Sequence, residues 1–331
     1  MGGLTLKFHR RRNNLYAGVP VFSVMRNEMY FLPHFLKHYR AMGVRSFIIY
    51  ADRCDEAFMS QLEAQQDVSI LFSSGAQYGD VFGVQTSGVP KRLIGLLKEH
   101  MSNHLLAGRW HVVADSDEFI VLPPPFSGLD DYTRFLENSG ADHVFASMVD
   151  FYPRRLRERN YDPAVDPFQA CSYFDEGPYH ALDSASGSIL QKKFGVRGRI
   201  LRYLLKTFPD EMKALEVGPG HYVGALDYKF PIMKSSNAHQ RMGDHRISGV
   251  PSIRNACTIA HFKFYPELDE KVRTALTEGQ YYKGSVEYRM LDFALRRLGD
   301  ADLVTAVSRR YTSPADLVAA GFMETADGCL P

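Results

Sequence analysis

Short apolar runs alternate with amphipathic stretches along the first 115 residues of the chain. The runs are rich in β-branched and aromatic residues, which is typical of strands, and they span 19–24, 46–51, 68–72 and 110–114. The stretches between them carry a helical pattern, clearest where apolar residues recur at three- and four-residue spacing, and predict helices over 31–42, 55–65 and 90–106. This alternation predicts an α/β fold with a mostly parallel sheet and crossover helices.

Polar and charged residues follow three of the predicted strands. In open parallel sheets, ligands bind beyond the carboxyl ends of the strands, so these positions are the candidates for chemistry. They are Arg26, Asn27 and Glu28 after the first strand, 52–55 after the second, and 115–118 after the fourth. From about residue 145 onward the pattern is less regular, until 268–298 again shows helical spacing and predicts two helices packed on the α/β body.

The composition is that of an ordinary globular protein and narrows the function classes. The 331 residues include 39 basic and 38 acidic side chains, and a net charge of +1 gives no global signature of nucleic-acid binding. The four cysteines lie far apart, which argues against a zinc knuckle or a disulfide framework. No segment reaches the ~18 to 20 apolar residues needed to cross a bilayer, and the polar start lacks the core of a secretory signal, so we expect a cytoplasmic protein.

A basic run stands near the N-terminus, where Lys7, His9 and three arginines fall within 7–12. Each basic residue adds about 1 kcal/mol of attraction near an anionic membrane surface. The run therefore predicts peripheral contact with lipid headgroups at the inner face of a membrane. A solvated, frayed terminus is the alternative.

Three carboxylates, those of Asp115, Asp117 and Glu118, follow directly after the apolar strand 110–114. So much like charge in one turn is costly unless a positive charge balances it. A divalent cation would do so, and carboxylate oxygens suit Mg²⁺ or Mn²⁺. The turn therefore predicts a metal site, with a solvated acidic turn or a helix cap as the alternative.

The segment 115–119, Asp-Ser-Asp-Glu-Phe, resembles the D-x-D-E-[FL] segment of bacterial glycosyltransferases of the family-two type. The Asn27-Glu28 pair followed by a helix with His38 and Gly43 is similar to the opening segment of that family, and 48–55 resembles its second strand and acidic turn. That turn departs from the usual D-x-x-S-x-D, because Asp52 is displaced and a cysteine stands in place of the serine. Later segments also resemble a proteobacterial branch of the family, and they span 148–153, 172–175, 237–240 and 259–264.

The resemblance runs from about residue 17 to 290 and implies the GT-A nucleotide-sugar fold, in which a sugar is transferred with inversion. It implies three domains, a basic segment 1–16, a catalytic domain 17–265 and a helical extension 266–331. It also implies Mn²⁺ or Mg²⁺ as cofactor, with Asp117 as direct ligand, Asp115 on the ribose or on the metal through water, and the late His261 reaching the same ion. By analogy alone, the donor is expected to be a UDP-sugar, the acceptor a glycan or a lipid-linked glycan, and the setting bacterial surface polysaccharide assembly.

The remaining roles follow from position. Asn27, Glu28, Asp52 and Asp55 stand after the first two strands and are expected to hold the base and ribose, and Lys91 is expected to neutralise phosphate. An inverting displacement also needs a carboxylate that takes the proton of the acceptor hydroxyl. Asp150 and Asp175 are the first candidates because they fall in the resembling segments, although carboxylates in such turns commonly cap helices. His239 is a weaker candidate for contact with diphosphate or acceptor.

Several other functions are weighed against this one. The pairs His34/His38 and His100/His104 lack the glutamate of a zinc protease, and no nucleophile elbow, Walker loop or dinucleotide fingerprint occurs in context. A sugar nucleotidyltransferase stays open, although 24–28 contains no glycine with which to cradle a triphosphate. A non-catalytic carbohydrate-binding or scaffolding protein with a GT-A-like fold is the alternative from another class.

Overall fold

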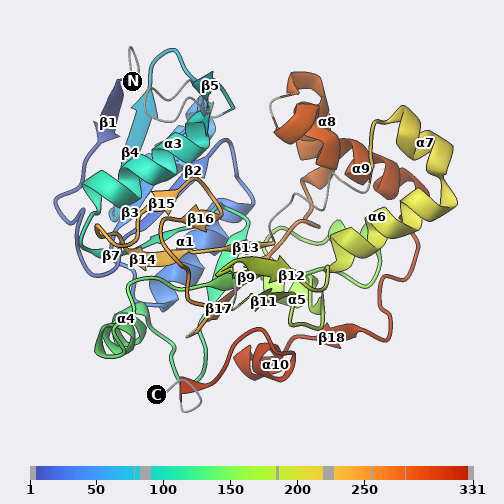
Figure 1. Cartoon of the computed structure of the whole chain (residues 1–331). Coiled ribbons are helices and arrows are strands. Elements are labelled where there is room, and N and C mark those ends of the chain that lie inside the picture. The colour runs from blue at the N-terminus through green and yellow to red at the C-terminus, as the bar shows by residue number, and fades with distance from the viewer. Residues whose placement is uncertain are drawn as a thin grey trace. The chain divides into compact units, whose positions relative to one another are not determined.

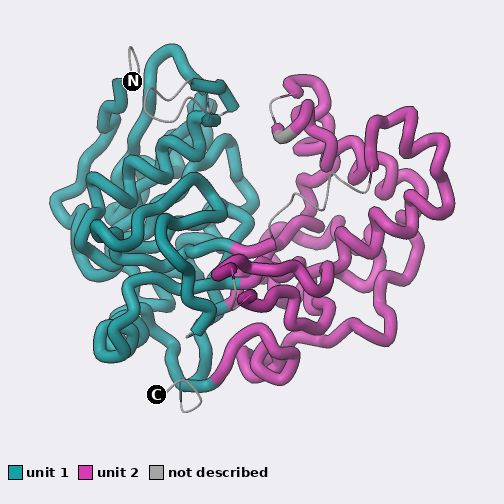
Figure 2. Tube along the Cα trace, in the orientation of Figure 1, with its two compact units in different colours: residues 1–146, 229–257, 325–331 teal, residues 147–228, 258–324 magenta. Residues whose placement is uncertain are grey.

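The computed structural model describes residues 5–77, 79–82, 91–183, 186–218, 227–254, 256–279 and 281–326. The chain divides into two compact units, drawn in different colours in Figure 2. Unit 1 comprises 1–146, 229–257 and 325–331, and unit 2 comprises 147–228 and 258–324. These boundaries describe compactness, and the division at 16/17 and 265/266 stays a prediction about where the catalytic domain begins and ends.

Unit 1 contains a six-stranded sheet in the order β1-β4-β3-β2-β7-β14 (Figure 1). Its four central strands run parallel to one another: β2 (Val21–Met25), β3 (Phe47–Ala51), β4 (Val68–Ser73) and β7 (Trp110–Val113). The two outer strands are antiparallel: β1 (Leu6–Arg10) and β14 (Ile232–Lys234). The expected α/β architecture with a mostly parallel sheet is thus confirmed.

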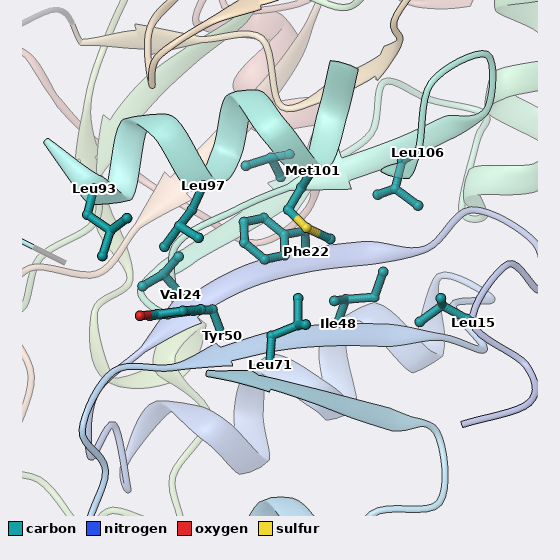
Figure 3. Close-up of a cluster of buried hydrophobic side chains, with 11 residues drawn as sticks. Leu15, Phe22, Val24, Ile48, Tyr50, Leu71, Leu93, Leu97, Met101 and Leu106 are labelled. Atoms are coloured by element: carbon teal, nitrogen blue, oxygen red, sulfur yellow. The ribbon is translucent and has the colours of Figure 1, made fainter. Parts of the chain in front are cut away.

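The central strands are buried along their length because helices cover the sheet. Every residue of β2 and β3 is buried, which is why these strands read as nearly continuous apolar runs. The helices of this region are α1 (Phe31–Ala41), α2 (Glu56–Ala64) and α3 (Leu93–His100). Figure 3 shows Leu93 and Leu97 of α3 directed at the sheet, near Val24 and Tyr50. A fully buried side chain of this kind contributes about 1.5–3 kcal/mol, so these contacts fix α3 against the strands.

Two segments differ from their sequence prediction. The helix expected over 90–106 is α3 followed by a π-helical turn over Met101–Leu105, and residue 90 lies outside the described residues. The basic segment near the N-terminus is not frayed, because Leu6–Arg10 pairs with β4 as β1. Arg10 and Arg12 donate hydrogen bonds to the carbonyl oxygens of Glu63 and Gln65, respectively, at the end of α2. Contact of this segment with lipid stays a prediction.

The other elements of unit 1 are short. They are β5 (Val81–Phe82), β6 (Lys91–Arg92), β8 (Glu118–Val121), α4 (Leu129–Asn138), β15 (Arg241–Met242) and β16 (Arg246–Ile247). β5 pairs with β6 and β15 pairs with β16, both antiparallel. Strand β15 lies close to the π-helical turn that follows α3, where Asn103 and the backbone of Arg241 exchange two hydrogen bonds of 2.9 Å.

Unit 2 is built from short strands and a group of helices. Strand β9 (Ala146–Asp150) lies between β13 (Tyr228–Lys229) and β17 (Cys257–His261) in the strand order, and β9 and β17 begin at boundary residues. Further strand pairs are β10 (Tyr173–Asp175) with β18 (Ser308–Arg310) and β11 (His180–Leu182) with β12 (Ile189–Gln191). The helices are a 3₁₀ turn (Leu156–Arg159), α5 (Pro167–Ala170), α6 (Val196–Thr207), α7 (Pro209–Ala214), α8 (Leu268–Glu278), α9 (Tyr282–Leu298) and α10 (Pro314–Ala319).

The last two long helices of the chain lie where the sequence predicts two helices, over 268–298. α8 and α9 cover this segment and pack against each other, so the expectation of two helices is confirmed. Gly279, which has φ of +62°, ends α8 in the left-handed conformation that glycine adopts without cost. Across the described ranges, no helix combines the length and the apolar character needed to span a bilayer.

Candidate functional site

The strand order of the unit 1 sheet reverses between β2 and β7. The chain passes from β2 through α1 to β3 on one side and later returns to β7 on the other side of β2. Val21 pairs with Val112 and Phe22 with Val113, so the carboxyl ends of the two strands reach the same edge. In open α/β sheets, ligands bind in the crevice outside the carboxyl ends at such a switch point. The residues after β2 and β7 therefore form the candidate site.

Three predicted nucleotide-binding residues lie together at this edge. The Oδ1 atom of Asn27 accepts a hydrogen bond of 2.9 Å from the backbone nitrogen of Asp55, and the backbone nitrogen of Asp52 donates to the carbonyl of Met25 at 2.9 Å. Asn27 and Arg53 both have φ near +50°, a region that is costly for residues other than glycine. Such backbone strain clusters at binding sites, where the surrounding structure maintains it.

The carboxylate of Asp55 also has a structural role as a helix cap. Its Oδ1 atom accepts a hydrogen bond of 2.8 Å from the backbone nitrogen of Phe58 and so caps the N-terminus of α2. A cap of this kind stabilises a helix by about 1 kcal/mol. Asp52 is almost fully buried, whereas Glu28 is part-exposed. The structure thus brings Asn27, Asp52 and Asp55 together, and their binding of base and ribose stays a prediction.

Two buried lysines of the protein form ion pairs with the acidic turn after β7. Lys98 Nζ lies 2.7 Å from Asp115 Oδ1, and Lys229 Nζ lies 2.7 Å from Asp115 Oδ2 and 2.6 Å from Glu118 Oε1. Lys98 also pairs with Asp244. The two lysine side chains are only 1% and 7% exposed. The two ammonium groups thus offset part of the carboxylate charge from which a cation is predicted, and the metal site stays a prediction.

These contacts set the protonation states of the turn. Burial acts to raise the pKa of Asp115, but Lys229 and Lys98 outweigh it and hold the pKa well below its usual range. Burial raises the pKa of Glu118, which Lys229 only partly offsets. Burial also lowers the pKa of the nearby Arg241 to about 10. At neutral pH Asp115 is therefore a carboxylate whose two oxygens are both held.

Asp117 occupies a different position in the same turn. It is half-buried, whereas its neighbours Ser116 and Glu118 are buried. A hydrogen bond of 3.1 Å from the backbone nitrogen of Glu118 to the carbonyl of Asp115 closes the turn around it. Lys91, the predicted phosphate ligand, forms an ion pair of 2.6 Å with Glu99 on α3. A phosphate would therefore have to share this lysine with Glu99.

In unit 2, Asp150 and His261 lie in direct contact. His261 Nδ1 is 2.7 Å from Asp150 Oδ1, and Arg197 Nε donates to Asp150 Oδ2 at 2.7 Å. Burial acts to raise the pKa of Asp150, but Arg197 and His261 lower it strongly. Both oxygens are thus engaged by basic groups, and the carboxylate is a weak base. The predicted metal ligand His261 is positioned by the residue that was predicted to be the general base.

Arg197 gathers two further carboxylates in unit 2. Its Nη1 atom lies 2.6 Å from Glu287 Oε1 and its Nη2 atom 3.7 Å from Asp227 Oδ1. Burial raises the pKa of Asp227 to about 6, because Arg197 lowers it less than burial raises it. Asp227 is therefore the carboxyl of this cluster that changes protonation nearest to neutral pH.

Asp175 lies in a separate ion pair of unit 2. Arg199 donates to both of its oxygens, with Nε to Oδ2 at 2.6 Å and Nη2 to Oδ1 at 2.9 Å, and the hydroxyl of Tyr152 donates to Oδ1 at 2.5 Å. Such a bidentate pair is strong and geometrically fixed. The second predicted base is thus a buried carboxylate with a full set of donors.

Sequence reasoning missed the partners of these carboxylates, namely Lys98, Lys229, Arg197, Asp227 and Asp244. Lys98 lies within the apolar stripe of α3, next to the buried Leu97, and this is a weak local signal for a buried charge. Lys229 and Arg197 stand 114 and 47 residues from their partners Asp115 and Asp150. Pairs so distant in sequence arise from tertiary contact and leave no local pattern.

Comparison with known proteins yields little. No protein-family model matches the chain, and no curated protein matches it. Among solved structures, it is similar to a putative glucose-1-phosphate thymidylyltransferase from Bacillus anthracis, crystallised with a sucrose. That match has 9% identity and a TM-score of 0.26, and covers 44% of this chain and 61% of the other. A similarity of this size carries no functional argument.

Proposed function

We propose that the chain is a metal-dependent glycosyltransferase that moves a sugar, with inversion, from a nucleoside-diphosphate donor to a glycan or lipid-linked acceptor. One observation supports this above the others. Asp115 and Asp117 of the D-x-D turn, Asn27 and Asp52 follow three neighbouring parallel strands at the switch point of a mostly parallel sheet. This edge is where α/β proteins bind nucleotides, and the turn sequence is the part that resembles the family.

The donor set fits a hard divalent cation at Asp117. Its carboxylate oxygens suit Mn²⁺ or Mg²⁺, ions that keep several positions for water and phosphate. Asp115 fits a direct ligand less well, because its oxygens are held by Lys98 and Lys229. This agrees with a role for Asp115 on the ribose or on a metal-bound water. When bound, the ion supplies Lewis-acid stabilisation of the negative charge that develops on the departing diphosphate.

The side chains at the sheet edge would then bind and orient the donor. Asn27, Glu28, Asp52 and Asp55 hold base and ribose in this proposal, and Lys91 contributes positive charge near phosphate. The lysine pair keeps the Asp115 carboxylate in one orientation, so its hydrogen bond to a ribose hydroxyl needs no rearrangement. We retain His261 as a proposed metal ligand, with Asp150 as the residue that orients its ring.

The acceptor must lose a proton as its oxygen bonds to the anomeric carbon and the diphosphate leaves. A general base works best when its pKa lies near the working pH. Asp150 and Asp175 each have both carboxylate oxygens engaged by hydrogen bonds from other side chains, so neither presents a free oxygen to the acceptor hydroxyl. Asp227, with its pKa of about 6 and a single looser ion pair of 3.7 Å, fits the task better. We therefore propose Asp227 as the base in place of the two aspartates favoured by the sequence.

The test is release of nucleoside diphosphate from a panel of nucleotide sugars in the presence of Mn²⁺. Asp117→Asn is expected to lower turnover by at least about 100-fold, because the ion contributes several kcal/mol and 1.36 kcal/mol corresponds to a factor of ten. The matched control is Asp131→Asn, an exposed aspartate of α4 that pairs with Arg134. Unchanged turnover in folded Asp117→Asn protein would refute the proposal.

The same assay separates the second candidate. A sugar nucleotidyltransferase would use the same edge of the sheet and the same carboxylates, so the geometry fits both enzymes. The products differ, because a nucleotidyltransferase releases pyrophosphate from a nucleoside triphosphate and a sugar 1-phosphate. Pyrophosphate release that depends on Asp117, with no nucleoside diphosphate formed from any nucleotide sugar, would identify that enzyme instead.

A further inference from the structure

We propose that Asp142, His143 and His239 form a second metal site in unit 1, suited to Zn²⁺ and separate from the acidic turn. His143 Nδ1 lies 2.8 Å from Asp142 Oδ1, and His239 Nδ1 lies 2.9 Å from Asp142 Oδ2. One nitrogen from each ring and one carboxylate oxygen all lie within 4.8 Å of one another. Two imidazoles thus converge on one carboxylate.

The site and the acidic turn lie at opposite ends of the strand pair β7 and β14. Asp142 accepts a hydrogen bond from the backbone of Lys234, and His143 forms a bridge with Met233 of β14. Lys234 pairs with Trp110, the first residue of β7, whereas the acidic turn follows the last one. At about 3.3 Å per residue, the two ends of the strand pair are ~10 Å or more apart. The inference therefore does not depend on the proposed transfer reaction.

The donor set and spacing suit a transition metal. Zinc bonds of ~2.0–2.2 Å in tetrahedral geometry place ligand atoms about 3.4 Å apart, so each nitrogen–oxygen pair needs to open by about half an ångström. Two imidazoles with one carboxylate suit zinc better than magnesium or calcium. His143 is buried, whereas Asp142 and His239 are part-exposed, which leaves access for a water as fourth ligand.

One hydrogen bond makes the inference testable in detail. The backbone nitrogen of Ser252 donates to His143 Nε2 at 2.9 Å, so Nε2 is unprotonated and Nδ1 carries the proton shared with Asp142. A metal ion on Nδ1 moves that proton to Nε2, where it would face the Ser252 N–H. Binding must therefore release this amide. A cluster that is held by hydrogen bonds alone would show no such coupling.

The experiment uses the full chain, stripped with a chelator, in the Asp117→Asn background so that the acidic turn does not contribute. Titration with Zn²⁺ is followed by calorimetry, and exchange of the Ser252 amide by hydrogen exchange. We expect one equivalent bound and faster exchange at Ser252. His239→Gln is expected to weaken binding by at least about tenfold, the loss seen even for residues that only support a ligand. His104→Gln, in the His100/His104 pair of unit 1, is the control and should bind as the parent does.

The outcomes are distinct. Absence of Zn²⁺ binding, binding that survives His239→Gln, or binding that leaves Ser252 exchange unchanged would each overturn the site. Thermal unfolding without metal shows whether a variant is folded, and Asp142→Asn provides a second substitution if one fails. Loss of nucleotide-sugar turnover in Asp117→Asn bears only on the transfer reaction and leaves this test unaffected.

Discussion

Two buried charge clusters, one in each unit, pair their carboxylates with positive charges in different ways. In unit 1, the carboxylates of Asp115, Glu118 and Asp244 face two lysines, and each lysine bridges a pair of carboxylates. In unit 2, three carboxylates share one guanidinium, that of Arg197, with an imidazole as the further partner. Lysine is a compact charge on a flexible stem, whereas arginine presents a rigid fork. The first cluster distributes its positive charge over two lysines. In the second, Arg197 alone contacts all three carboxylates, and Lys263 also lowers the pKa of Glu287.

The difference shows where a proton can be held. Within the unit 1 cluster, Glu118 is the carboxyl whose pKa is raised, chiefly by burial, and it keeps an ion pair of 2.6 Å. The corresponding carboxyl of unit 2 is Asp227, whose nearest guanidinium nitrogen is 3.7 Å away and whose pKa rises to about 6. The comparison suggests that the turn of unit 1 presents fixed charge and that the cluster of unit 2 exchanges a proton.

The strongest test of this dependence is Arg197→Met. The substitution leaves Asp150, Asp227 and Glu287 without their shared cation, and breaking a buried pair in this way typically costs 3–5 kcal/mol. We expect the free energy of unfolding, measured with urea at pH 7, to fall by about that amount. Arg202→Met, at an exposed position on the same helix, should change it by less than about 0.5 kcal/mol. Equal losses in the two variants would show that the ion pairs of Arg197 with the three carboxylates contribute no more stability than an exposed arginine does.

Lys98→Met tests the shared cluster of unit 1. It removes the partner of Asp244 and one of the two partners of Asp115, while Lys229 remains. We therefore expect a loss of about 3 kcal/mol, at the low end of the range for buried pairs. Urea unfolding at pH 7 measures it, with Arg134→Met in an exposed ion pair of α4 as control. A loss larger than that of Arg197→Met would reverse the comparison.

The sheet was predictable because its signal is local. β2 and β3 are buried at every position, so their apolar runs stand out from the amphipathic helices that follow. The rule that ligands bind beyond strand ends then singled out Asn27 and Asp115, which the structure places at the switch point. That the two meet follows from the strand order, which the sequence pattern does not contain.

The charge partners were not predictable, because they are brought together by contacts between residues far apart in the sequence. The sequence shows that like charges at Asp115 and Glu118 need a positive partner. It does not show that Lys98 and Lys229 form ion pairs with them. The N-terminal strand was missed because its alternation, over Leu6–Arg10, is short and masked by basic residues. The local sequence pattern thus located the sheet edge that carries the candidate site. Which groups neutralise the carboxylates there depends on tertiary contacts.

The smallest expected effect comes from Asp227 and concerns pH. Its pKa is about 6 in the folded chain and 3.8 in the reference state, so the folded form binds the proton more tightly. The stability it contributes is therefore full below about pH 4 and is lost as pH rises through about 6. At 1.36 kcal/mol per pKa unit, the loss is about 2–3 kcal/mol by pH 8.

Asp227→Asn removes this titration. The free energy of unfolding of the parent, minus that of the variant, should fall by about 2–3 kcal/mol between pH 4 and pH 8, and urea unfolding across this range measures it. Asp210→Asn, an exposed aspartate in the first turn of α7, is the control and should leave the pH dependence of the parent unchanged. A difference that is constant with pH would mean that Asp227 stays ionised throughout. The single guanidinium would then suffice for all three carboxylates, and the contrast between the two clusters would disappear.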